Sequence, residues 1–183
     1  MCIHKYARLI RRYSMTTADY LALRRGTDVC GIATALTENQ QVTLTEEAVQ
    51  HIAKSFCVWL ITHTGKTKVS VAIGYDARLS SPILCEAVVE GILSTGHNAV
   101  VTDLSSTPSM RMLLQDDAWL EKYPCDGSIM ITAGHLPKQY NGMKFFFGDH
   151  TLLAEDVESI LDMAGHYRYA EPSTPGQRIE IST

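Results

Sequence analysis

The chain has 183 residues, of which 45% are hydrophobic and 20% charged, a composition typical of a folded globular protein with one hydrophobic core. Its formal net charge of -4 contains no long run of like charges, which argues against nucleic acid or an anionic membrane as a partner. No apolar run is long enough to span a membrane, no signal-peptide pattern follows the basic N-terminus, and the five cysteines are widely spaced, so we expect a cytoplasmic protein with reduced thiols.

The first part of the chain alternates between helical and strand patterns. We expect residues 1–22 to form a helical N-terminal extension. Thr45, followed by two glutamates, predicts the start of a helix, because a hydroxyl cap and acidic residues suit the positive end of the helix dipole. Apolar residues at helical spacing continue to Gly65, and the β-branched run at 69–73 then predicts a buried strand.

The second part continues this alternation. Pro82, preceded by Ser80 and Ser81 as caps, predicts the first turn of another helix, which ends near Gly96. The remaining predicted elements are a strand at 99–101, a short helix at 109–114, strands at 128–132 and 143–147, and a helix at 153–163.

Strands that alternate with helices predict the fold class. Parallel strands need crossovers that cover both faces of a sheet, so we expect a three-layer α/β/α domain over residues 23–165. The short return between Thr132 and Met143 predicts that the last strand runs antiparallel. The expected fold is therefore α/β with a mixed, mostly parallel four-stranded sheet. Residues 166–183 contain two prolines and are expected to be a linker or C-terminal tail.

The most informative segment runs from 129 to 147 and reads IMITAGHLPKQYNGMKFFF. It displays a polar loop between two apolar strands, where binding and catalytic residues are common. His135 is the only side chain of this loop that exchanges protons near neutral pH, although a single loop histidine is more often a surface residue. Lys144 is either a solvated lysine on an edge strand or a cation at a site. Asn141 and Gly142 are interpreted as a turn pair, since both tolerate positive φ.

A second polar loop, from Gly74 to Pro82, joins a predicted strand to the helix that follows it. In an open α/β sheet such loops line the crevice at the carboxyl ends of the strands, where a helix N-terminus can bind an anion. The alternative is purely structural. Asp76 and Arg78 would form a buried pair that stabilises the turn, and Ser81 would act as a hydroxyl cap.

The order T-A-G-H-L-P and then N-G-x-K closely resembles the active-site loop of the α-D-phosphohexomutases, the family of phosphoglucomutase and phosphomannomutase, whose motif reads T-A-S-H-N-P. Gly134 stands at the position of the family's phosphate-carrying serine, and Leu136 stands at that of its asparagine. The loop is therefore similar to the family's loop but chemically altered.

Three other family motifs match in the correct chain order. They are G-T-D-V-C-G, in which Cys30 replaces the family's arginine, then G-x-D-x-R-x-S-S, and then Thr107-Pro108. The similarity extends from about Gly26 to about Asp162 and covers only the first of the family's four domains.

The resemblance implies roles for individual residues. The catalytic positions would be Gly134, at the phosphoserine position, with His135 and Lys144. Support of the phosphate loop would come from Asp76, Arg78, Ser81, Thr132 and Asn141. The resemblance also implies Mg²⁺ for the full-length enzyme, with no strong metal ligand in this chain. The implied partners are a hexose phosphate substrate or hexose bisphosphate intermediate and the missing domains II–IV.

Three functional hypotheses follow. The first is the N-terminal domain of a phosphoglucomutase/phosphomannomutase-like protein, which moves a phosphoryl group within hexose phosphates in carbohydrate metabolism; this chain alone would be inactive, because Gly134 carries no oxygen. The second is a non-catalytic phosphosugar-binding or protein-interaction module derived from the same fold. The third is an unrelated α/β nucleotide-binding or structural domain, for which the chain offers neither G-x-G-x-x-G nor a P-loop.

Overall fold

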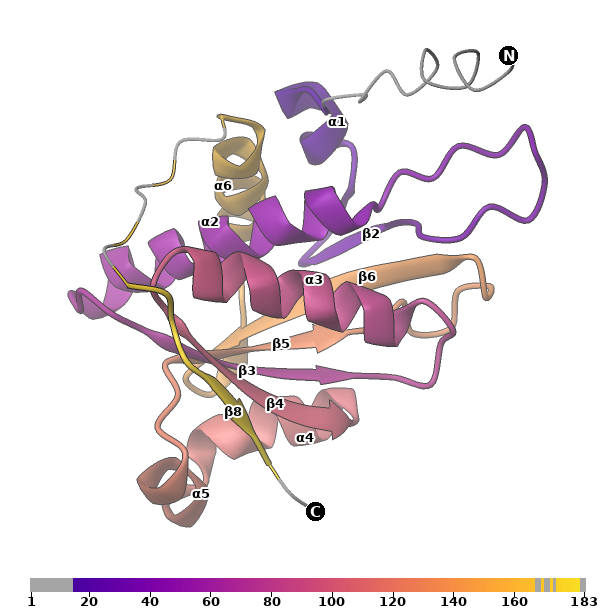
Figure 1. Cartoon of the computed structure of the whole chain (residues 1–183). Coiled ribbons are helices and arrows are strands. Elements are labelled where there is room, and N and C mark those ends of the chain that lie inside the picture. The colour runs from indigo at the N-terminus through magenta and orange to yellow at the C-terminus, as the bar shows by residue number, and fades with distance from the viewer. Residues whose placement is uncertain (1–14, 167–168, 170–171, 173, 182–183) are drawn as a thin grey trace, which may run out of the picture.

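The computed structural model describes residues 15–166, 169, 172 and 174–181, which form an α/β domain with a central sheet between two layers of helices (Figure 1). The sheet has eight strands in this part of the chain, with the order β1-β2-β6-β5-β3-β4-β8 and with β7 paired to β6. The strands are β1 (Arg24–Arg25), β2 (Asp28–Ile32), β3 (Ser70–Tyr75), β4 (Asn98–Leu104), β5 (Gly127–Ile131), β6 (Tyr140–Phe147), β7 (His150–Thr151) and β8 (Arg178–Glu180).

Helices cover both faces of the sheet, as the predicted three-layer fold requires. Figure 1 shows α2 and α3 on one side and α4 and α5 on the other. The helices are α1 (Thr17–Leu21), α2 (Glu46–Thr64), α3 (Ser81–Ser94), α4 (Thr107–Met112), α5 (Asp117–Lys122) and α6 (Ala154–His166), with a 3₁₀ turn, η1, at Leu113–Gln115. None of these helices is both long and apolar enough to cross a membrane.

The alternation of side chains along the strands separates two cores. Ile129 and Ile131 of β5 belong to the large core under α2, α3 and α6, whereas Met130 between them belongs to the smaller core against α4 and η1. Both cores exclude solvent, since Ile129 and Ile131 are fully buried and Met130 is only 2% exposed. The sheet is thus fixed from both faces, and the loops at the ends of its strands have a rigid base.

Helix α2 follows from the sequence signals that predict it. The Thr45 side chain accepts a hydrogen bond from the Ala48 N–H at 3.1 Å, and Gly65 ends the helix with φ 68°. Helix α3 begins where predicted, but Ser80 makes no side-chain cap hydrogen bond. The prediction of Ser80 as a cap is therefore wrong, because its hydroxyl is used by a buried side chain of β6.

The sheet is larger than the predicted four strands. The four predicted strands are present as β3, β4, β5 and β6, joined by parallel β3–β4 and β3–β5 pairs and the expected antiparallel β5–β6 pair. The additional β2, β1 and β7 extend the antiparallel side, and β8 pairs in parallel with β4. The prediction of four strands is wrong because the additional strands are short and are specified by their partners more than by their own pattern.

The first and last elements of the described residues also take part in this domain. Helix α1 begins with a capping box formed by Thr16 and Asp19, and Tyr20 is fully buried in the large core. Residues 1–14 of the predicted helical extension lie outside the described residues. In the predicted tail, β8 joins the sheet beside β4.

The interpretation of Asn141-Gly142 as a turn pair is wrong. Both residues lie inside β6, where Gly142 is paired with Cys30 and Asn141 with Gly31 of β2. A Cβ on Gly142 would lie 2.2 Å from the Val29 carbonyl oxygen and 2.9 Å from that of Thr132. Glycine is required there by the close approach of three backbones.

Candidate functional site: a loop fixed beside an anion-sized cavity

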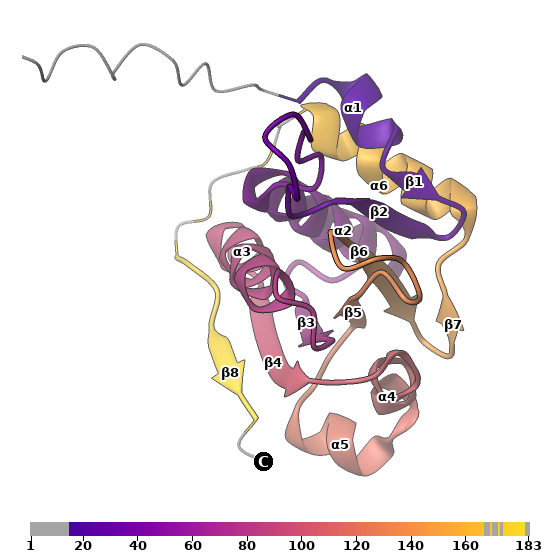
Figure 2. The ribbon, with the colours of Figure 1, turned by 90° about the vertical axis from the view of Figure 1, so that its right-hand side faces the viewer.

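The loop between β5 and β6 and the loop after β3 lie side by side at one end of the sheet (Figure 2). Strands β3 and β5 are parallel neighbours with Tyr75 opposite Ile131, so both chains leave the sheet at the same edge. The Asp76 N–H donates to the Ile131 carbonyl at 3.0 Å and fixes the start of one loop against the end of the other strand.

Arg78 connects the two loops. Its Nη1 donates to the carbonyls of Pro137 and Tyr140 at 3.0 and 3.1 Å, its Nη2 donates to the Gly134 carbonyl at 2.6 Å, and its Nε pairs with the Asp76 carboxylate at 3.0 Å. The side chain is only 12% exposed, so these bonds form with little competition from water. The conformation of the β5–β6 loop therefore depends on one guanidinium from the loop that follows β3.

Asp76 is the acceptor at the centre of this network. Its carboxylate accepts from the Ser81 and Thr132 hydroxyls, both at 2.7 Å, and from the Arg78 N–H at 3.2 Å. Burial alone would raise the pKa of Asp76, but these hydrogen bonds and the Arg78 charge outweigh it and lower the pKa below its ordinary value of 3.8. Asp76 is thus held as a carboxylate.

Asn141 and Thr132 complete the network from β6 and the end of β5. The fully buried Asn141 amide donates to the hydroxyls of Ser80 and Ser81, each at 2.9 Å. The Thr132 hydroxyl, which donates to Asp76, accepts from the Gly134 N–H at 3.0 Å. The structure thus brings the five predicted supporting residues into one hydrogen-bonded network: Asp76, Arg78, Ser81, Thr132 and Asn141.

We predict that Asp76→Asn lowers the free energy of unfolding by about 2 kcal/mol at pH 7, because it removes the charge that four donor groups share. Since the folded pKa is lowered, this stabilisation is complete above the unfolded pKa and is lost as the pH falls through the folded value. Urea denaturation at pH 7 and at lower pH should therefore show that the free energies of unfolding of the variant and the wild type become more similar below about pH 4.

Asp149→Asn is the matched control for this variant, because the Asp149 side chain is 83% exposed. It should stay within about 0.5 kcal/mol of the wild type at both pH values. An Asp76→Asn chain as stable as this control would show that the network does not hold the loop.

Two of the three candidate catalytic residues line a cavity of about 110 Å³ between this loop and β2. Gly134 and Lys144 line it, together with Asp28, Cys30 and Thr132. Other lining residues are Arg25, Val29, Ala133 and Leu136. The volume suits a small anion such as phosphate, and the lining supplies cationic side chains.

Gly134 and His135 form the exposed tip of the loop. Gly134 has φ 57°, and a Cβ built on it would meet no atom within 4 Å. His135 is also exposed and does not line the cavity. The loop therefore presents backbone, and no hydroxyl, at the position of the family's phosphoserine.

Lys144 lies in the interior of the sheet. Strand β6 runs between β2 and β5, so the interpretation of Lys144 as an edge-strand lysine is wrong. Its ammonium group forms an ion pair with Asp28, which stands directly opposite it on β2. The lysine side chain is 24% exposed, so its charge is fixed at the cavity and still reachable from solvent.

Cys30, which replaces the family's arginine, is 8% exposed in the cavity wall. Burial raises the pKa of its thiol, and the nearby charges of Arg25, Arg78 and Lys144 lower it only in part. The thiol is therefore neutral at physiological pH. Arg25 is the functional candidate that sequence reasoning missed; its signal was its position just before the G-T-D-V-C-G motif.

The residues of this cavity do not form a metal site. The Asp28 Oδ1 atom is buried without a hydrogen-bond partner in the described part of the chain, which would suit a cation. However, the other oxygen of the same carboxylate is paired with Lys144, and the described residues contain no cluster of three potential metal ligands. These residues therefore do not fit Mg²⁺ on their own.

Comparisons with known proteins identify the family of this chain. Residues 30–167 match the family described as phosphoglucomutase/phosphomannomutase, alpha/beta/alpha domain I. Phosphoglucosamine mutase of Clostridium kluyveri is 32% identical over 132 residues, which are 72% of this chain and 28% of that protein. The same enzyme of Clostridium acetobutylicum is 35% identical over 115 residues, 63% of this chain and 24% of that protein.

A solved structure shows the same fold. A phosphoglucomutase/phosphomannomutase family protein from Burkholderia thailandensis superposes with a TM-score of 0.66 at 17% identity, over 91% of this chain and 33% of that chain. The chain thus spans about a quarter of the length of the curated relatives it matches. The hypothesis of an unrelated nucleotide-binding or structural domain is wrong, and the chain belongs to the phosphoglucomutase/phosphomannomutase family, of which it contains α/β/α domain I.

Proposed function

We propose that this chain is the phosphate-facing part of a phosphohexomutase active site, which binds a hexose phosphate or hexose bisphosphate in carbohydrate metabolism. The observation that carries the proposal is the anion-sized cavity in which Lys144 faces the Gly134 loop. The rigid anchoring of this loop by Arg78 supports it, because a pre-formed site loses little entropy when it binds an anion.

Each candidate residue has a part in this proposal. Lys144 neutralises charge on the phosphate group, and the loop backbone at Gly134 lies beside that group. His135, exposed at the loop tip, exchanges a proton with a sugar hydroxyl. Asp76 and Arg78 act through the loop and do not contact the substrate.

The chain by itself binds but does not transfer the phosphoryl group. Transfer to the protein needs an oxygen at the loop, and Gly134 has none. The nearest hydroxyl, that of Thr132, is occupied by hydrogen bonds with Asp76 and with the Gly134 N–H. Activity of a full-length protein would further require Mg²⁺ and the family's domains II–IV. We also propose that the protein acts in the cytoplasm.

A second candidate function is favoured by the two changes at one cavity. Both the serine position, Gly134, and the arginine position, Cys30, have lost the group that the resemblance implies. A non-catalytic module that binds a phosphosugar or a protein partner would keep the cavity and lose the chemistry. Incubation of a longer form of the protein with glucose 1,6-bisphosphate separates the two, since covalent labelling with mutase turnover would exclude the non-catalytic function.

The proposed function predicts that Lys144→Gln weakens binding of glucose 1,6-bisphosphate about tenfold, because a charge-assisted hydrogen bond is lost. The loss also leaves the Asp28 carboxylate without its counterion, which adds repulsion. Titration calorimetry on the whole chain measures the change. Lys138→Gln is the matched control, because Lys138 is exposed on the same loop but does not line the cavity, and it should stay within about twofold. Equal effects of the two variants would contradict a specific site.

A further inference from the structure

Three charged side chains stand in one row across the antiparallel side of the sheet. Arg25 of β1 is directly opposite Asp28 of β2, and Asp28 is directly opposite Lys144 of β6. Directly opposite residues in antiparallel strands project from the same face, so all three side chains lie on the face that carries the cavity. The row contains two cations and one carboxylate.

Arg25 is the cation of this row that is not neutralised. Lys144 is paired with Asp28, whereas within the described residues no hydrogen bond or ion pair involves the Arg25 side chain. Its neighbour Arg24 projects from the other face and pairs with Glu158 at 3.3 Å. The two adjacent arginines therefore differ: Arg24 is paired within the domain, whereas the guanidinium of Arg25 has no such partner among the described residues.

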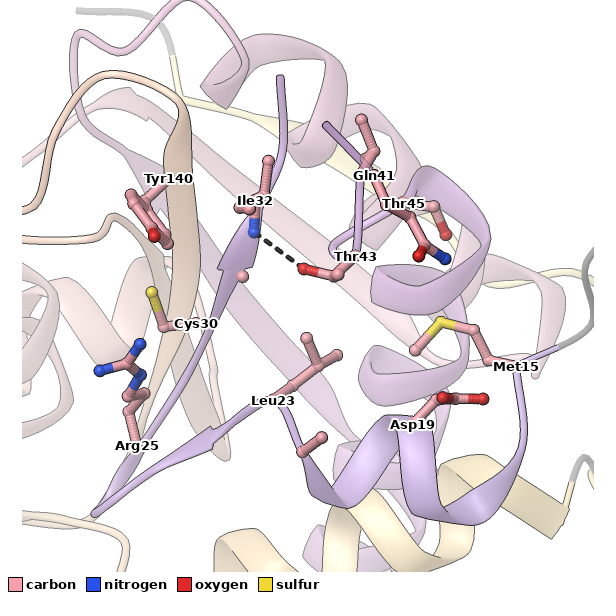
Figure 3. Close-up of a pocket in the computed structure, with 13 residues that line it drawn as sticks. Met15, Asp19, Leu23, Arg25, Cys30, Ile32, Gln41, Thr43, Thr45 and Tyr140 are labelled. Carbon is pink, nitrogen blue, oxygen red and sulfur yellow. Dashed lines mark hydrogen bonds between the residues drawn. The ribbon is translucent and has the colours of Figure 1, made fainter. Parts of the chain in front are cut away.

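Arg25 also stands where two cavities meet. It lines the small cavity at the Gly134 loop and a neighbouring cavity of about 520 Å³ beneath α1, and Cys30 is the other residue that lines both. Figure 3 shows Arg25 and Cys30 close together at one side of the larger cavity, with Tyr140 above them. A ligand that fills both cavities must pass this pair.

The chemistry of this junction identifies the ligand group. The neutral Cys30 thiol offers no charge to an anion, but the Arg25 guanidinium offers a planar fork that matches phosphate oxygens. Of the charged neighbours, Arg25 lowers the pKa of the Cys30 thiol most, which agrees with the proximity of the two side chains. A positive charge is thus supplied beside Cys30 from the neighbouring strand.

We infer that Arg25 binds a phosphate group of the sugar phosphate at the junction of the two cavities, and so supplies the positive charge that position 30 lacks. This inference rests on the proposed function and extends it to a residue outside the recognised motifs. The larger cavity then holds the uncharged part of the ligand, between Thr43 and Tyr140.

The test compares Arg25→Gln with Arg24→Gln by titration of the whole chain with glucose 1,6-bisphosphate. We expect Arg25→Gln to weaken binding about tenfold, with a smaller loss at high salt, because a charged hydrogen bond to phosphate is removed. Arg24→Gln removes the same charge from the other face and should change the affinity by less than about twofold. Equal affinities of the two variants would overturn the role of Arg25 and leave the proposed function intact.

A second variant restores the positive charge at position 30. Cys30→Arg in the Arg25→Gln background should recover most of the lost affinity, since its guanidinium reaches the same junction from β2. Failure to recover, with an unchanged circular dichroism spectrum, would contradict a shared phosphate position. A wild-type chain that does not bind the bisphosphate at all would overturn the proposed function, and the role of Arg25 with it.

Discussion

Gly142→Ala should lower the free energy of unfolding by about 3 kcal/mol, at the upper end of the usual cost of overpacking. The added methyl group would lie 2.2 Å from the Val29 carbonyl oxygen, a backbone atom that cannot rotate away. Either β2 or β6 must therefore move, and the pairing between Gly142 and Cys30 must weaken. Because both strands line the small cavity, the variant should also lose affinity for phosphosugar.

Urea denaturation of Gly142→Ala measures this loss, and Gly134→Ala is its matched control. A Cβ on Gly134 meets no atom within 4 Å, so the control bears only the strain of an alanine at φ 57°, about 1 kcal/mol. If both substitutions lowered the free energy of unfolding equally, the close approach of the backbones at Gly142 would not be the reason that glycine is required there.

Arg78→Ala should lower the free energy of unfolding by about 3 kcal/mol and make the β5–β6 loop mobile, because four side-chain hydrogen bonds are lost at once. The Asp76 carboxylate would also lose its counterion in a half-buried position. Hydrogen exchange of the amides in 133–136 should then become much faster, while exchange in the long helix α2 changes only through the lower global stability.

Arg111→Ala is the control for this prediction, since Arg111 is an exposed arginine of α4 on the other side of the sheet. It should change the free energy of unfolding by less than about 0.5 kcal/mol and leave the exchange of the loop amides unchanged. Loop exchange that stays slow in Arg78→Ala would show that the loop is ordered without the guanidinium.

Sequence predicts the long elements of this fold because their signals are local. Helix α2 has its own cap at Thr45 and its own glycine stop at Gly65, and β3 is a buried β-branched run. Strand β8 carries two charged residues in three and is a strand only because it pairs with β4. Such strands have no pattern of their own to predict them.

The local contacts of the site could also be predicted from the sequence, whereas its long-range contacts could not. The Asp76–Arg78 pair follows from its spacing in one loop and is present in the structure. The bonds from Arg78 to the Gly134 and Pro137 carbonyls depend on the parallel pairing of β3 with β5, which brings distant segments together. Arg25 was missed because its place in one row with Asp28 and Lys144 depends on two antiparallel pairings, and neither β1 nor β2 was predicted.

The most direct test of a phosphosugar site at the Gly134 loop is an NMR titration of the ¹⁵N-labelled wild-type chain with glucose 1,6-bisphosphate. We predict saturable shifts of the amides in 132–136 and of those next to Lys144 and Arg25, with no shifts in α5 across the sheet. The absence of shifts at millimolar ligand, or shifts confined to residues away from this loop, would contradict the account.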